Sequence, residues 1–159
     1  MAVTLRGSGQ VPVQVISTTL KSSVSTTATS PTNLTGMSVT ITPTSASNRI
    51  LIQAALNVSI GAQRRIYFTV TGGNAASYIG DAGTGQECAA AFCSRVNDDY
   101  VMGTTPLLYL DSPATTSAVT YQVQWWIESG STAYLNRPVN LDANGANQAS
   151  TITVMEISG

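Results

Sequence analysis

The sequence predicts an all-β protein, an antiparallel β-sandwich formed by a single domain. Three observations carry this prediction. Apolar and polar residues alternate with a period of two in several segments. These segments are separated by turn-forming residues, namely Gly, Pro, Asn, Asp and Ser. No segment combines a helical repeat with capping residues. A chain of 159 residues has the usual length of one domain.

The segment Ile50–Ile60 is the clearest expected strand. Every even-numbered position in it is apolar, and the odd-numbered positions include Gln53, Asn57 and Ser59. Such alternation is the pattern of a strand with one buried face. Because a slip of one residue would turn the apolar side chains toward solvent, the orientation of this strand is strongly specified.

Other segments repeat the alternation or share its composition. Three of them alternate clearly: residues 37–42, 66–71 and 119–128. Shorter strands are expected in segments that are rich in β-branched and aromatic residues, namely Val11–Ser17, Thr104–Leu110, Thr132–Leu135 and Ser150–Ile157. Turn-forming residues punctuate the chain at 43–48, 71–74, 129–131 and 142–145.

The remaining segments are less periodic. Leu20–Thr35 is rich in Ser and Thr, and we expect either a polar strand or a long loop there. Residues 72–100 are expected to form loops that include short strands. About eight to ten strands with regular turns favour a sandwich of the jelly-roll type, with an immunoglobulin-like sandwich as the nearest alternative. Residues 1–12 are expected to form an extended N-terminal arm, and residues 13–159 to form the sandwich domain.

Several positions that face away from the predicted core are apolar. Leu51 and Ala55 lie on the outer face of the Ile50–Ile60 strand, and Trp126 lies on the outer face of the 119–128 strand. The last strand is apolar on both faces, and Met155 and Ile157 belong to it. Exposed apolar patches usually mark interfaces, so these five residues are predicted interface residues. The alternative is that loops of the chain itself cover them.

The composition argues against catalysis and against a charged partner. The sequence contains no histidine, only 9% of its residues are charged, and its formal net charge is −1. Without histidine, the usual pairs of nucleophile and base and most zinc sites are excluded. A nearly neutral chain offers no electrostatic basis for binding nucleic acid or a membrane. We therefore expect no enzymatic activity, no cofactor and no metal.

Three local features have ordinary explanations. Arg64-Arg65 is the only basic pair, and we expect a solvated or intersubunit contact. Asp98-Asp99 lacks the spacing of a calcium-binding loop, so a solvated loop is favoured over a Ca²⁺ site. Cys88 and Cys93 are expected to be free thiols because the N-terminus lacks a secretory signal, although a turn between them would permit a disulfide.

Several segments together resemble a domain of structural proteins in the virions of tailed phages, notably cyanophages and other aquatic phages. The most specific block is Gly36-Met-Ser-Val-Thr-Ile-Thr-Pro-Thr-Ser45, and it is accompanied by Val13–Thr19, Leu34–Ile52, Thr151–Ile157 and the shorter matches at 110–113, 120–124 and 134–136. The resemblance covers nearly the whole chain. It implies a β-sandwich that assembles as a homotrimer and is displayed on the virion, and it supplies no catalytic residues.

This resemblance leads to two main functional hypotheses. The first is a capsid decoration (cement) protein, a homotrimer seated on the major capsid protein or another virion protein after assembly in the host cytoplasm. A chain that is nearly all one domain fits this role. The second is a fibre or receptor-binding protein that recognises a host surface glycan through residues 72–100 and Trp126. A glycan hydrolase is a weaker third hypothesis, because no opposed pair of carboxylates stands out in the sequence.

Overall fold

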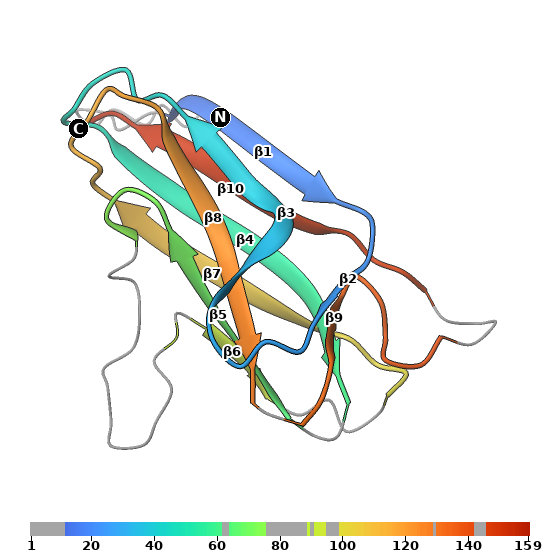
Figure 1. Ribbon diagram of the computed structural model, residues 1–159. Helices are drawn as coiled ribbons and strands as arrows, with labels where there is room; N and C mark the ends of the chain where they lie inside the picture. The colour runs from blue at the N-terminus through green and yellow to red at the C-terminus, as the bar shows by residue number, and fades with distance from the viewer. Residues whose placement is uncertain are drawn as a thin grey trace, which may run out of the picture.

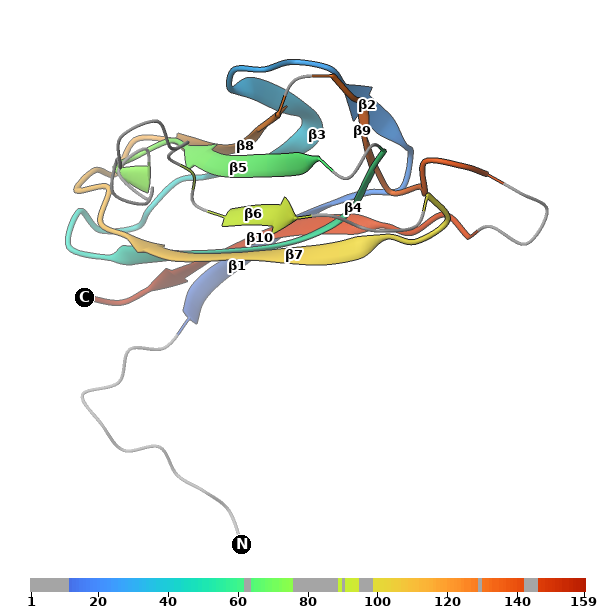
Figure 2. The same ribbon diagram turned by 90° about the horizontal axis from the view of Figure 1, so that it is seen from below.

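The computed structural model describes residues 12–61, 64–75, 89, 91–94, 99–128, 130–141 and 146–159. These residues form two antiparallel sheets, and no helix is present among them. The sheets lie face to face, as the edge-on view in Figure 2 shows. The predicted all-β sandwich is therefore confirmed.

The first sheet has six strands, four of them long. The long strands lie in the order β1 (Pro12–Leu20), β10 (Ser150–Ile157), β4 (Arg49–Ile60) and β7 (Gly103–Asp111), as Figure 1 shows. The short strand β9 (Ala133–Leu135) pairs with the end of β4, and β2 (Val24–Thr26) pairs with β9. Because β10 and β7 both pair with β4, this strand is the centre of the sheet.

The second sheet has four strands in the order β3 (Thr32–Ile41), β8 (Val119–Ile127), β5 (Arg65–Thr71) and β6 (Ala91–Ser94). β8 pairs with both β3 and β5 and occupies the middle of this sheet. The two central strands, β4 and β8, are those with the longest alternating patterns in the sequence. The pattern is cleanest there because a central strand packs one whole face into the core.

The core lies between the sheets. All even-numbered residues of β4 from Ile50 to Ile60 are buried, and Phe68 and Tyr121 are among the largest fully buried side chains that face them. Burying a large apolar side chain contributes roughly 1.5–3 kcal/mol, so the packing of these inward faces is the main stabilising term of the fold. No helix among the described residues is long and apolar enough to cross a membrane.

The structure departs from the sequence prediction at β3. The strand begins at Thr32 rather than Met37, and its register with β8 shifts between Asn33 and Ser38. Gly36 lies within this irregularity with a φ of +80°, a backbone conformation that glycine adopts without strain. The bulge breaks the alternation, so the residues before it do not have the pattern of a strand.

Two short strands lie in segments of weak periodicity. β2 lies in the polar segment 20–35, and β6 lies in the segment 72–100 that was expected to be mostly loop. Apart from Pro12, which begins β1, the predicted N-terminal arm lies outside the described residues, as do Cys88, Asp98 and most of residues 76–98.

Candidate interaction surface

The outer face of the first sheet carries an apolar row that crosses all four long strands. Val15 of β1 is paired with Met155 of β10, Met155 with Leu51 of β4, and Leu51 with Leu110 of β7. Residues that are directly paired on one face have neighbouring side chains. The strand pairing thus places four apolar residues from distant parts of the sequence side by side. We call this set the apolar row.

The ends of the apolar row are its most exposed parts. Val15 is 56% exposed and Leu110 is 38% exposed, whereas Leu51 and Met155 are half-buried. Two more exposed apolar residues flank these ends, Val13 on β1 and Leu108 on β7. Of the seven large apolar side chains exposed in the described part of the chain, four therefore lie on this one face. Such concentration is unusual on a monomer and is typical of an interface.

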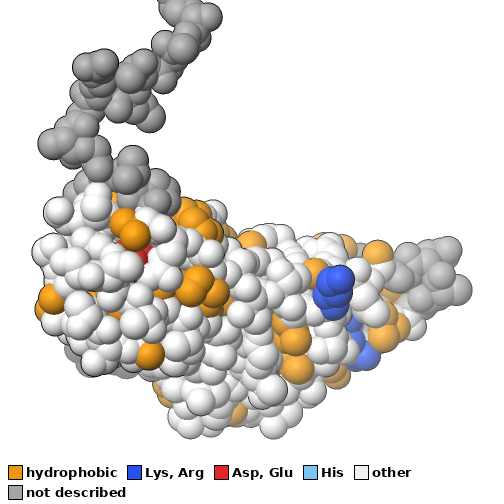
Figure 3. All heavy atoms as spheres, turned by 90° about the horizontal axis from the view of Figure 1, so that it is seen from above, with side chains coloured by type: hydrophobic (Ala, Val, Ile, Leu, Met, Phe, Trp, Pro, Cys, Tyr) orange, Lys and Arg blue, Asp and Glu red, His pale blue; other side chains and the backbone are white. Residues whose placement is uncertain are grey.

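The rest of this face carries mostly uncharged residues, both polar and apolar. The next row joins Ser17, Thr153, Gln53 and Leu108, and the row after it joins Thr19, Thr151, Ala55 and Pro106. The hydroxyls of Ser17 and Thr153 are 3.0 Å apart. Among the outward positions of the four long strands, only Arg49 is charged. Figure 3 views the molecule edge-on, from above Figure 1, and that side also shows few charged side chains among the white and orange surface.

Four of the five predicted interface residues belong to this face. Leu51 and Met155 are the middle of the apolar row, Ala55 lies four residues further along β4, and Ile157 is paired with Arg49 at one end of the sheet. Trp126 lies elsewhere, on the outer side of the second sheet. The strand pairing brings the four together, because β10 and β4 are neighbours although they are far apart in the sequence.

Trp126 is only 2% exposed. Its ring stacks on that of Tyr67 of β5, with ring centres 5.5 Å apart and planes inclined by 25°. The remaining outer face of the second sheet is polar: the Gln122 amide donates hydrogen bonds to the backbone carbonyls of Leu34 and Met37. In the single chain, therefore, Trp126 packs against its own subunit and offers little surface to a partner.

A buried carboxylate on β10 links neighbouring segments by hydrogen bonds at the β1–β10 side of the first sheet. Glu156 of β10 is fully buried and accepts hydrogen bonds from the side chains of Gln14, Thr44 and Asn48 and from the Thr44 backbone N–H, at 2.6–2.8 Å. Burial by itself would raise the pKa of this carboxyl, but the hydrogen bonds outweigh it and lower the pKa to about 2. Glu156 is therefore ionised at neutral pH and links β1 and the turn before β4 to β10.

A second buried carboxylate joins the two sheets. The Tyr121 hydroxyl of β8 donates a hydrogen bond of 2.6 Å to Asp111 at the end of β7, and the backbone N–H of Asn74 donates to the same carboxylate. Burial, the hydrogen bond to Asp111 and its negative charge together raise the pKa of Tyr121 far above its ordinary value. Both polar groups therefore have partners within the chain, which is the arrangement of a structural pair.

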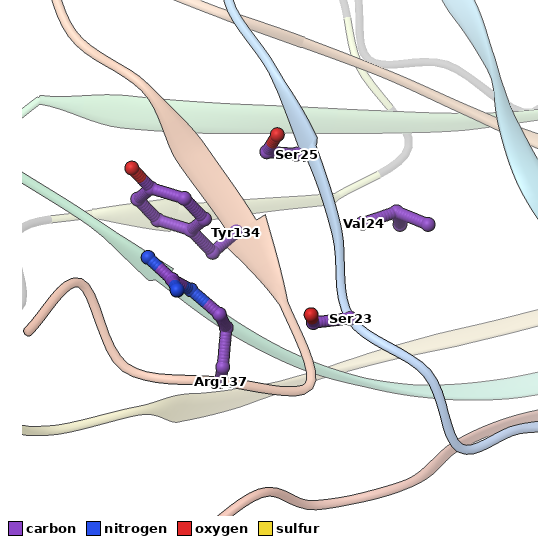
Figure 4. A pocket seen from close by; sticks show the side chains of 5 residues that line it. All are labelled: Ser23, Val24, Ser25, Tyr134 and Arg137. Atoms are coloured by element: carbon purple, nitrogen blue, oxygen red, sulfur yellow. The ribbon is translucent and has the colours of Figure 1, made fainter. Parts of the chain in front are cut away.

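A shallow pocket lies where β2 and β9 meet. It has a volume of about 130 Å³ and is lined by Ser23, Val24, Ser25, Tyr134 and Arg137 (Figure 4). The Arg137 guanidinium lies over the Tyr134 ring, 4.0 Å from its centre, and donates a hydrogen bond to the Val139 carbonyl. The volume corresponds to roughly four water molecules, so the pocket suits one small group rather than a long ligand.

The described residues also include a cluster of ion pairs, but no group that could bind a metal ion. Among them, no group of three or more His, Cys, Asp or Glu side chains is arranged to hold a metal ion. Arg64 and Arg65 both pair with Glu128, at 3.3 Å each, in a partly exposed cluster of ion pairs. No model of a known protein family matches the chain, and a comparison with curated proteins finds no match.

Sequence reasoning missed the residues at the two ends of the apolar row. Val15 and Leu110 lie in segments with the expected alternation, but the sequence does not show which strand each one pairs with. The only available signal was that Val13, Val15, Leu108 and Leu110 are apolar at alternate positions of strands that also have an inward apolar face.

Proposed function

We propose that this chain is a structural protein of a tailed-phage virion, a capsid decoration protein that docks on the head as a homotrimer. The observation that carries the proposal is the apolar row on an outer face of the first sheet where, among the long strands, only Arg49 is charged. A face of this kind fits docking onto another protein surface, since it is apolar along one row and nearly free of charge. The resemblance of the sequence to phage virion proteins supports the same function.

The energetics favour docking by several copies at once. Covering the four half-exposed side chains of the apolar row would contribute roughly 3–6 kcal/mol, before the cost of association. A complex with micromolar affinity requires about 8 kcal/mol. A single subunit would therefore bind weakly, whereas linked copies that engage neighbouring sites gain affinity through their high effective concentration. This argument supports a homo-oligomer, and the resemblance suggests the trimer.

The order of the strands supports the finer description of the fold as a jelly roll. If the eight strands other than β2 and β9 are counted along the chain, the first sheet has the order 1-8-3-6 and the second the order 2-7-4-5. Two interleaved Greek keys produce this arrangement, which occurs in viral capsid proteins and in lectins. The fold alone does not determine the function, so the proposal depends on the surface.

Immunogold labelling of intact virions with an antibody against this chain tests the proposed location. Label distributed over the whole head is the result expected for a decoration protein. Label confined to the tail or to one vertex would contradict it and would favour a fibre. Cryo-electron microscopy of the same particles would then show whether the density has three-fold symmetry.

A binding assay with undecorated shells tests the proposed surface. Leu110→Lys places a charge at the exposed end of the apolar row, and we expect it to weaken binding at least tenfold. Thr120→Lys is the matched control, because Thr120 is exposed on the outer face of the second sheet. Equal binding by both variants and the wild type would rule out the apolar row as the docking surface.

A second candidate function, recognition of a host surface glycan, is favoured by one observation. Tyr134 and Arg137 form a stacked pair in the pocket between β2 and β9, next to the hydroxyls of Ser23 and Ser25 (Figure 4). Aromatic rings and hydrogen-bonding groups of this kind contact sugars. Loss of host-cell binding in Tyr134→Ala, with head labelling absent, would support this function over decoration. Trp126 no longer contributes to this candidate because it is buried.

A further inference from the structure

β1 is an open edge of the first sheet. On one side β1 pairs with β10 over almost its whole length, and on the other side it pairs with no strand in the described part of the chain. β3 of the second sheet lies close to β1, and the Gln14 amide donates a hydrogen bond to the Thr42 carbonyl that follows β3, but no ladder joins the two strands. β1 therefore presents a row of backbone N–H and C=O groups at the margin of the molecule, where Figure 1 shows it.

From Gln14 to Leu20, this edge lacks the features that normally prevent strand addition, as far as the described residues show. Natural proteins protect edge strands with lysine, proline, bulges or covering segments. From Gln14 to Leu20, β1 contains no charged residue and no proline, and its register with β10 is regular. β7, the edge strand at the other side of the long strands, contains Pro106 near its middle. Of these two edges, β1 is the one that has neither proline nor charge over most of its length, from Gln14 to Leu20.

We infer that two copies of this chain pair through β1, edge to edge and antiparallel, so that their first sheets join into one continuous sheet. A second copy is a suitable partner because β1 has no charge to repel an identical strand across a two-fold axis. The side chains also suit such pairing. Val13 and Val15 are exposed β-branched residues, and Ser17 and Thr19 already form hydroxyl pairs with Thr153 and Thr151 on the other side of the strand.

The inference goes beyond the proposed function and does not depend on where the protein resides. If the homotrimer forms through other surfaces, β1 pairing would join trimers in twos, giving a particle with three-fold and two-fold axes. If the trimer does not form, β1 pairing would give a dimer. In both cases the number of subunits is even, which distinguishes this contact from the trimer contact.

Sedimentation of the full-length protein over a range of concentrations tests the inference. We expect an even-numbered assembly for the wild type and at least tenfold weaker pairing in Ser17→Lys, which places like charges on opposite sides of the two-fold axis. Leu108→Lys is the control, since Leu108 lies in the same row and on the same face but on β7. Circular dichroism melting must show that both variants remain folded.

Disulfide trapping provides a second test that does not depend on destabilising a contact. In a Cys88→Ser, Cys93→Ser background, cysteine is introduced singly at Val13, Val15, Ser17 or Thr19. Two identical antiparallel strands bring only positions next to the two-fold axis within the distance of a disulfide, so one position should cross-link fastest. Three results would overturn the inference. They are uniform cross-linking at all four positions, a monomer or trimer without even-numbered species, and equal weakening of subunit pairing by Ser17→Lys and Leu108→Lys. A trimer alone would leave the proposed function intact.

Discussion

The buried carboxylate of Glu156 links three segments through hydrogen bonds and without a cation. Its partners are Gln14 on β1 and Thr44 and Asn48 in the turn before β4. Because its folded-state pKa of about 2 lies below its ordinary value of 4.5, the ionised carboxylate stabilises the fold above about pH 4.5. That stability is lost as the pH falls toward 2. The shift corresponds to roughly 3 kcal/mol.

We predict that Glu156→Gln lowers the free energy of unfolding at pH 7, because the amide cannot accept all of these hydrogen bonds. The pH dependence of stability between pH 5 and 2 should also become flatter than in the wild type. Urea unfolding at several pH values measures both effects. Glu128→Gln is the control: its carboxylate pairs with Arg64 and Arg65 near the surface, and its loss should cost less than about 1 kcal/mol. Similar effects of both substitutions would contradict the prediction.

The hydrogen bond between Tyr121 and Asp111 leads to a second prediction for single residues. Tyr121→Phe preserves the ring in the core but leaves a buried carboxylate without its closest side-chain donor. Such an unsatisfied group costs about 1–3 kcal/mol, which should be visible in equilibrium unfolding. Tyr67→Phe is a matched control on the outer side of β5, where the ring stacks on Trp126, and it should change stability by less than about 0.5 kcal/mol.

For the strand β8, the structure predicts that Trp126 stabilises the subunit. Trp126→Ala would remove a buried ring and its stacking on Tyr67, and large-to-small substitutions of this kind cost about 3–5 kcal/mol. We therefore expect a clear decrease in melting temperature, measured by circular dichroism. Docking to shells should persist below that temperature. A variant that melts like the wild type but no longer docks would show instead that Trp126 belongs to an interface.

The predictability of the strands follows from their length and position. β4 and β8 were evident in the sequence because central strands bury a full face and so alternate over many residues. β2 and β6 have three and four residues, too few periods to be recognised. The beginning of β3 was hidden by the irregularity around Gly36, where two residues in succession no longer face opposite sides.

At the scale of the molecule, the candidate surface was only partly predictable. The outward apolar residues of β4 and β10 were visible as exceptions to alternation, and Leu51 and Met155 proved to be direct neighbours. The apolar row depends on the order and register of four strands, which local patterns do not determine. Trp126 shows the converse: an apolar residue on an outer face can be covered by its own chain, so outward position alone does not identify an interface.

The near neutrality of the molecule leads to a final prediction about its assembly. The net charge is −1, and the outer face of the first sheet is uncharged apart from Arg49. Because Debye screening acts on charges and not on apolar contacts, the association that we propose should change little between low and high sodium chloride concentrations. Sulfate should strengthen it, since this ion is excluded from protein surfaces and favours apolar burial. Sedimentation in the three salt conditions measures the effect, and dissociation by sodium chloride would show that ion pairs, not the apolar row or the β1 edge, hold the assembly together.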